Sequence, residues 1–123
     1  PLVLAYVGDA VWELYVRSQL VAERGTYSRV NELHGLAKQA VNAESQAAMV
    51  HALMEYLDDE ERDVVRRGRN ARPGHVPRTS GPADYRHATG FEALLGFLHL
   101  TGRTQRLGEV LAVARCLVDG VGR

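Results

Sequence analysis

The sequence predicts one all-α domain, residues 1–123, of about six helices. Apolar residues recur every three or four positions through most of the chain, and no segment shows the sustained alternation typical of a strand. A chain of 123 residues, 46% of them hydrophobic, is long enough for one core of its own. The helical pattern breaks once, where three of the four prolines and two glycines fall within residues 73–82. This break predicts a mobile basic loop at about residues 70–84.

The N-terminal third is expected to contain two helices. A long first helix ends near Gly25, and a shorter second helix covers residues 28–39. The apolar positions that predict the first helix are Leu4, Val7, Val11, Leu14 and Tyr15.

Capping residues mark the starts of three further helices. Asn42 is a good N-cap for the third helix, and Asp58 followed by Glu61 is typical of a capping box for the fourth. Thr104 is suited to cap the last helix. The apolar faces fall at residues 50, 53 and 57 in the third helix, at 91, 94, 95 and 98 in the fifth, and at 107, 110, 111, 114 and 117 in the last.

The balanced charge of the chain conceals a basic segment. There are 15 basic and 15 acidic residues in all, but residues 62–87 contain seven arginines against Asp63 and Asp84, which gives +5 with neutral histidines. Clustered positive charge favours a local contact with a polyanion. The alternative is a solvated helix in which acids at the start and arginines at the end suit the helix dipole.

Several other chemistries find no support. The sequence has no GxGxxG, Walker A, HExxH, CxxC or GxSxG motif. Cys116 is the one cysteine, so it forms no intramolecular disulfide, and we expect it to pack in the last helix. The five histidines are scattered, without the helical spacing of a zinc pair. No membrane-spanning run or secretion signal is found, so a cytoplasmic protein with no membrane contact is expected.

Two carboxylates stand in apolar surroundings. Asp9 follows Gly8, and Glu92 lies in an apolar stretch that ends at Gly96. A buried carboxylate needs a compensating partner, because burial otherwise raises its pKa until it is neutral. If the two helices cross so that the acids meet, a hard cation such as Mg²⁺ satisfies both through oxygen ligands and keeps waters for chemistry.

Structural roles stay open for the same residues. Asp9 also suits a helix cap or a buried salt bridge, and Glu92 also suits a surface position near the start of its helix. Glu13 and Arg17 follow Asp9 at steps of one turn, which favours an ion-pair ladder. A second role for Glu13 is to orient a metal-bound water from outside the ligand set.

Four blocks of sequence resemble the catalytic domain of the ribonuclease III family, in the form found in the short bacterial enzymes called Mini-III. They are LAYVGDAVWELYVR at residues 4–17, NELH at 31–34, RRGRNA at 66–71 and YRHATGFEALLG at 85–96. The blocks occur in family order and cover almost the whole chain, so together they are specific.

The resemblance implies an all-α endonuclease fold, a homodimer, and Mg²⁺-dependent cleavage of double-stranded RNA to 5′-phosphate and 3′-hydroxyl ends, with Mn²⁺ as a substitute ion. It assigns metal binding and catalysis to Asp9 and Glu92. The relatives' substrate implies that precursor large-subunit ribosomal RNA is cut here. Two further family acids are replaced by Ala5 and Thr89, as in Mini-III enzymes, which leaves the number of metal ions open.

The resemblance also implies where RNA is held. The last helix is expected to reach nearly to Arg123, which leaves no room for a double-stranded RNA-binding domain, so the catalytic domain itself must grip the duplex. The residues expected to contact phosphates and 2′-hydroxyls are Arg66, Arg67, Arg69, Asn70, Arg72 and Arg78. For the dimer surface, the apolar residues of the first helix outside one core stripe are candidates, namely Trp12, Tyr15 and Val16; burial of that helix on two sides is the alternative.

Two other functions compete with the nuclease. A catalytically silent ribonuclease III-like scaffold would keep the fold and the basic segment but lose the metal pair, and here both acids are present. An unrelated helical module, for example one that recognises DNA, would show no Mg²⁺-dependent cleavage and no preference for A-form duplexes.

Overall fold

The computed structural model describes residues 1–25, 29–71 and 82–121. Within those ranges the chain forms helices only, with no strand, so the predicted all-α class and the predicted number of helices are confirmed. None of these helices has both the length and the apolarity needed to cross a bilayer. The helices are α1 (Leu2–Arg24), α2 (Val30–Val41), α3 (Ala43–Leu53), α4 (Asp59–Asn70), α5 (Pro82–Leu100) and α6 (Thr104–Val121).

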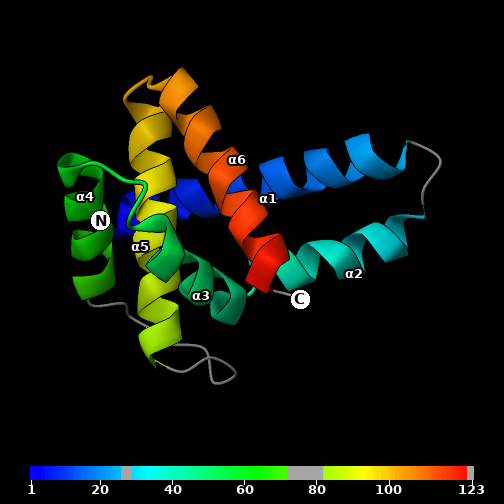
Figure 1. The fold of residues 1–123 in the computed structure, drawn as a ribbon, viewed down its shortest axis with the longest axis horizontal. Helices are drawn as coiled ribbons and strands as arrows, with labels where there is room; N and C mark the ends of the chain where they lie inside the picture. The colour runs from blue at the N-terminus through cyan, green and yellow to red at the C-terminus, as the bar shows by residue number, and fades with distance from the viewer. Residues whose placement is uncertain (26–28, 72–81, 122–123) are drawn as a thin grey trace.

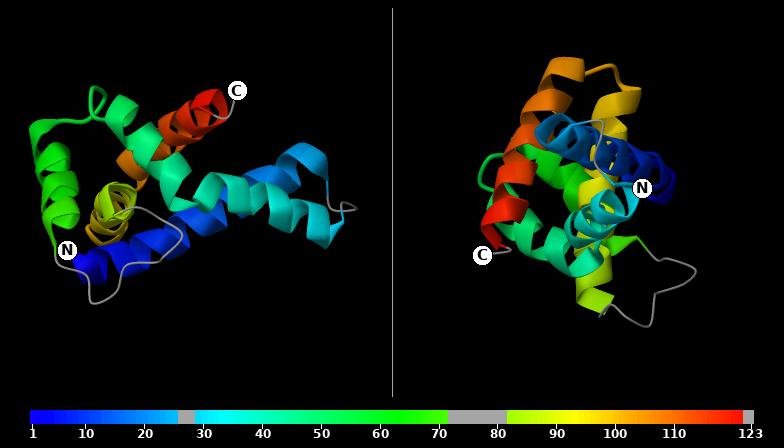
Figure 2. Two further views of the ribbon diagram at one scale, coloured as in Figure 1. Left: turned by 90° about the horizontal axis from the view of Figure 1, so that it is seen from below. Right: turned by 90° about the vertical axis from the view of Figure 1, so that its right-hand side faces the viewer.

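Helix α5 is the centre of the fold. In Figure 1, α1 passes behind it, α4 runs antiparallel along one side, and α3 and α6 lie in front. Helix α2 lies beside the C-terminal half of α1, as both views of Figure 2 show. Because α1, α3 and α4 all contact α5, this one helix brings together segments that are far apart in the sequence.

The core forms where α1 meets α5. Trp12 and Phe91 are fully buried, and their rings meet edge to face with centroids 5.1 Å apart. Val16 is also fully buried. The prediction that Trp12 and Val16 belong to a dimer surface is therefore wrong, because their side chains are already covered within one chain. Tyr15, the third residue of that prediction, is half-buried and packs against the core.

The predicted caps of α3 and α4 are confirmed. The Asn42 side chain accepts a hydrogen bond of 2.8 Å from the Ser45 N–H. The Asp58 carboxylate accepts one of 2.8 Å from the Glu61 N–H, and the Glu61 carboxylate accepts one of 2.9 Å from the Asp58 N–H, which completes a capping box. The boundaries differ slightly: α2 begins at Val30, and residue 57 lies in the turn between α3 and α4.

Glu61 has a second role that its capping position did not reveal. Its carboxylate is buried and accepts two hydrogen bonds of 2.7 Å from the Arg106 guanidinium, which joins α4 to α6. The bonds from Arg106 lower the pKa of Glu61 despite its burial. On the same helix as Arg106, Cys116 is exposed, so the expectation that it packs in the core is wrong.

Candidate active site

Helices α1 and α5 touch through their backbones. A Cβ atom on Gly8 would lie 1.6 Å from the carbonyl oxygen of Glu92, and one on Gly96 would lie 1.9 Å from the carbonyl oxygen of Leu4. No other residue fits at either position without moving a helix. The close approach puts Asp9, the neighbour of Gly8, beside Glu92, on the helices that cross in Figure 1.

The carboxylates at this crossing raise one another's pKa. Partial burial raises the pKa of Glu92 to about 8, with added repulsion from Asp9 and Glu13. Partial burial and Glu13 also raise the pKa of Asp9. Neither Asp9 nor Glu92 forms an ion pair with another residue in the described part of the chain, whereas Glu13 has the Arg17 guanidinium at 3.9 Å. The crossing therefore collects negative charge that the described side chains leave uncompensated.

The donors at the crossing fit a hydrated hard cation. Carboxylate oxygens are the ligands that Mg²⁺ prefers, and Mg²⁺ is usually held by only one or two of them together with several waters. The described residues contain no group of three or more histidine, cysteine, aspartate or glutamate side chains arranged to hold a metal. Asp9 and Glu92 thus form a two-carboxylate centre, with Glu13 close enough to act on both but not counted as a ligand.

The free energy of unfolding should depend on pH because of this uncompensated charge. The pKa of Glu92 is 4.5 when unperturbed and about 8 in the fold, so the folded state holds the proton more tightly and stability falls as pH rises between these values. In the presence of a chelator, the free energy of unfolding of wild type should fall between pH 5 and pH 8.5 by about 2 kcal/mol more than that of Glu92→Gln. This value is discounted because Glu92 is partly exposed to solvent. Urea denaturation at both pH values measures this difference. Glu109→Gln, a change on exposed α6 surface, is the matched control, and equal pH profiles for Glu92→Gln and wild type would contradict the assignment.

The residues expected to bind RNA are only partly brought together. Arg66 and Arg67 both pair with Asp63, the latter at 2.9 Å, so one carboxylate partly neutralises two guanidinium groups. Asn70 is exposed at the end of α4. Arg72 and Arg78 lie outside the described residues, as does most of the expected loop, whose outer residues 70 and 82–84 belong to α4 and α5.

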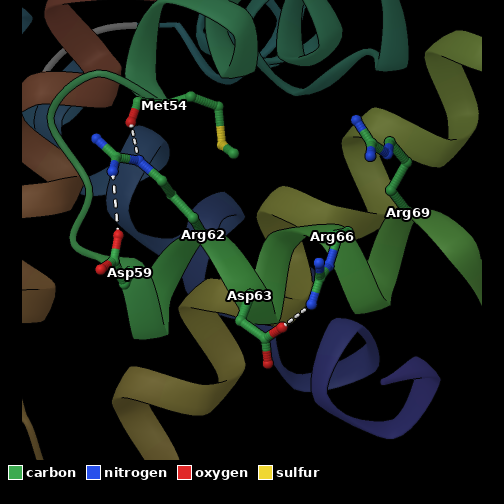
Figure 3. Close-up of a pocket in the computed structure, with 6 residues that line it drawn as sticks. All are labelled: Met54, Asp59, Arg62, Asp63, Arg66 and Arg69. Atoms are coloured by element: carbon green, nitrogen blue, oxygen red, sulfur yellow. Dashed lines mark hydrogen bonds and ion pairs between the residues drawn. The ribbon is translucent and has the colours of Figure 1, made fainter.

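Arg69 differs from the other arginines of α4. Among described residues it forms no ion pair, whereas Arg62 pairs with Asp59 at 3.4 Å. It lines a hollow of about 230 Å³ beside α4, which Met54 borders from the turn after α3 (Figure 3). The hollow is bordered by Met54, Asp59, Arg62, Asp63, Arg66 and Arg69. Asp9 and Glu92 instead lie at the crossing of α1 and α5, so this hollow is separate from the acidic centre.

One cluster was not anticipated from the sequence. The rings of His51, on α3, and His87, on α5, lie with centroids 4.4 Å apart. The two residues are 36 positions apart and neither belongs to a spacing motif. Only the packing of α3 on α5 brings them together, so sequence spacing held no signal for the pair.

Comparison with known proteins identifies the fold and its family. A family model described as "Ribonuclease III domain" matches residues 2–103. The chain is 51% identical over 119 residues to "Mini-ribonuclease 3" of Symbiobacterium thermophilum, covering 97% of this chain and 90% of that protein. It is 45% identical over 119 residues to "Mini-ribonuclease 3" of Thermoanaerobacter sp., covering 97% of this chain and 82% of that one.

A solved structure agrees with these sequence matches. The crystal structure of a protein from Fusobacterium nucleatum superposes with a TM-score of 0.79 at 27% identity, covering 91% of this chain and 88% of that one. Sequence and backbone thus lead to the same conclusion. The chain belongs to the ribonuclease III family of endoribonucleases, in its Mini-ribonuclease 3 group.

Proposed function

We propose that this endoribonuclease cleaves double-stranded RNA with Mg²⁺ held by Asp9 and Glu92, leaving 5′-phosphate and 3′-hydroxyl ends. The observation that carries the proposal is the meeting of two carboxylates at the α1–α5 crossing with no cationic partner among the described residues. Mn²⁺ has the same preference for oxygen ligands and is the expected substitute.

The side chains at the crossing have separate tasks. When bound, the ion lowers the pKa of a coordinated water and stabilises negative charge on the scissile phosphate. Asp9 and Glu92 hold it in ionised form, and the pKa of about 8 for Glu92 means that metal and proton compete for this carboxylate at neutral pH. Glu13 lies within electrostatic reach of both carboxylates and would orient a water of the bound ion by accepting a hydrogen bond from it.

The exposed face of α1 supports a homodimer. Val3, Tyr6 and Leu14 are 75%, 81% and 68% exposed and follow one another at helical spacing, which leaves an apolar stripe on α1 uncovered. Asp9 and Glu13 lie beside this stripe around the helix, between it and the buried face. A second copy packed on the stripe would therefore complete the surroundings of each acidic centre. We propose an isologous dimer with one centre per chain.

The RNA-binding assignment rests on α4. We propose that Arg66, Arg67, Arg69 and Asn70, together with Arg72 and Arg78, contact the phosphates and 2′-hydroxyls of an A-form duplex, because its deep major groove hides base edges from side chains. Precursor large-subunit ribosomal RNA in the cytoplasm is the proposed natural substrate. Its support is the resemblance of the chain to bacterial Mini-ribonuclease 3 proteins.

The direct test is to incubate the protein with a perfect RNA duplex in the presence and absence of Mg²⁺. We expect cleavage only with the ion, products with 5′-phosphate and 3′-hydroxyl ends, and short 3′ overhangs because two centres of a dimer cut opposite strands. A DNA duplex of the same sequence is the control and should stay intact. Binding of the RNA without cleavage in Mg²⁺ or Mn²⁺ would instead support the catalytically silent scaffold.

Salt dependence tests the proposed RNA contacts. The double variant Arg67→Ala and Arg69→Ala should bind duplex RNA more weakly. The negative slope of log affinity against log salt concentration should also become shallower by about 2, since each phosphate contact contributes about 0.9 to its magnitude. Fluorescence anisotropy with Ca²⁺ in place of Mg²⁺ measures the slope. Arg103→Ala, which removes a guanidinium paired with Glu60, is the matched control. An unchanged slope in the double variant would place the RNA contact elsewhere.

A further inference from the structure

Two imidazoles meet between α3 and the N-terminal part of α5, and the Arg69 guanidinium on α4 lies within electrostatic reach of His87. The imidazole rings of His51 and His87 lie 4.4 Å apart, with a tilt of 56° between their planes. Arg69 comes from the last turn of α4, whose backbone lies against Gly90 of α5: a Cβ on Gly90 would be 3.4 Å from the Arg69 nitrogen. The cluster is therefore built from α3, α4 and α5, and both α3 and α4 pack against α5.

The electrostatics of His87 show that these groups act on one another. Burial is the largest effect that lowers the pKa of His87, followed by repulsion from His51 and from Arg69, while Asp84 one turn earlier raises it. Within the described residues Arg69 has no ion pair to absorb its charge, unlike Arg62, Arg66 and Arg67 on the same helix. Asp59 and Asp63 border the same hollow as Arg69, but they pair with the other arginines of α4, so the charge of Arg69 is left without an ion-pair partner among the described residues.

We propose that His51, His87 and Arg69 form a binding site for a phosphate oxyanion. The imidazole N–H groups and the guanidinium fork supply several donors, which suits a tetrahedral anion with several acceptor oxygens. A bound metal ion is the less suitable occupant, because Arg69 would repel it and no described set of three metal-ligating side chains is available. The site takes phosphate either as a phosphodiester of an RNA backbone or as the free ion.

This site is distinct from the acidic centre. His87 lies five residues before Glu92, which places the two side chains about 140° apart around α5. His87 faces α3, where it meets His51, whereas the backbone of Glu92 meets α1 at Gly8. Phosphate binding here does not depend on the proposed cleavage reaction.

Binding is linked to protonation of His87. The free protein keeps this imidazole neutral near pH 7, because its pKa lies below the ordinary value of 6.5. An anion in contact favours the charged form, so it raises the pKa of His87 and binds more tightly as pH falls. A rise of about one unit corresponds to about tenfold tighter binding well below the pKa than well above it.

The test uses dimethyl phosphate, a phosphodiester whose single negative charge does not change over the pH range. NMR titration of the imidazole signals in the full chain, with sodium chloride holding ionic strength constant, should show shifts at His51 and His87. The pKa of His87 should rise by about one unit, and affinity should be several-fold higher at pH 5.5 than at pH 8. Signals of His99, exposed at the far end of α5, should stay in place.

Matched variants separate this site from general attraction to positive charge. His51→Asn and Arg69→Gln should abolish the response, while His99→Asn and Arg103→Gln should retain it. His51 is exposed, so its replacement is expected to leave the fold intact. The test therefore does not depend on a variant at half-buried His87, where a replacement could disturb packing. The proposal is overturned if His87 does not respond, if His99 shifts equally, if affinity is the same at both pH values, or if Zn²⁺ binds the pair in preference to phosphate.

Two further titrations identify the source of the phosphate. A short RNA duplex added without Mg²⁺ to the cleavage-deficient Asp9→Asn chain should raise the pKa of His87 if the backbone of RNA occupies the site. A rise with inorganic phosphate but not with RNA assigns the site to the free ion. If the pKa of His87 changes with none of the three, namely RNA, inorganic phosphate and dimethyl phosphate, the site is rejected. Failure of RNA cleavage with an intact phosphate response would reject the proposed nuclease mechanism alone.

Discussion

Gly8→Ala is expected to lose at least about 3 kcal/mol of unfolding free energy. Its new methyl group would lie 1.6 Å from the carbonyl oxygen of Glu92, and neither backbone can yield without separating α1 from α5. Alanine also has the higher helix propensity, by about 1 kcal/mol, so the predicted loss is net of that gain. Urea denaturation followed by circular dichroism measures the change.

Gly108→Ala is the matched control for this prediction. Gly108 lies exposed in α6, and a methyl group added there would have no heavy atom of another residue within 4 Å, so the replacement should stabilise the protein by about 0.5–1 kcal/mol. A Gly8→Ala protein within about 1 kcal/mol of wild type would show that the two helices tolerate a wider crossing. The close contact would then not be what holds Asp9 beside Glu92.

Asp9→Asn is expected to reduce RNA cleavage at least about 10³-fold while the fold and duplex affinity are kept. An amide oxygen has no charge to hold the ion, and Asp9 is exposed enough for the change to cost little stability. Removing its charge should also lower the pKa of Glu92, because Asp9 contributes to raising it. Single-turnover cleavage assays, with NMR of the Glu92 carboxyl group, measure both effects.

The control for Asp9→Asn is Asp119→Asn, which makes the same chemical change on the exposed surface of α6. It should cleave RNA at the wild-type rate. Cleavage by Asp9→Asn at near that rate would remove Asp9 from the proposed metal centre. Loss of folding in Asp9→Asn, detected by circular dichroism, would contradict the expectation that the residue serves chemistry and not structure.

Sequence reasoning was strongest where the signal is local. The caps at Asn42 and Asp58 involve residues three positions apart, and both have the predicted hydrogen bonds. The approach of Asp9 to Glu92 follows from the close contacts of Gly8 and Gly96. Apolar surroundings in the sequence singled out both carboxylates but left structural roles open. The resemblance to a known family was needed to assign metal binding to them.

Periodicity was least informative on α1. Apolar residues occur around most of α1, so spacing indicated a helix but not which side is covered. Trp12 was a candidate for the dimer surface, and the structure instead buries it fully, in agreement with the stated alternative. Side-chain contacts between helices far apart in the sequence could not be predicted either. The hydrogen-bonded ion pair between Glu61 and Arg106 joins residues 45 positions apart. Such pairs depend on how the helices pack, which a local sequence pattern does not indicate.

The central position of α5 also has a consequence for synthesis on the ribosome. Helix α1 is made before α5, its main packing partner, which follows about 80 residues later in the chain, since Gly8 meets Glu92. At about 5–20 residues per second, the nascent α1 waits several seconds with Trp12 and its apolar neighbours uncovered. Folding of the α1–α5 core therefore requires a long-range closure, which is completed only after α5 leaves the exit tunnel.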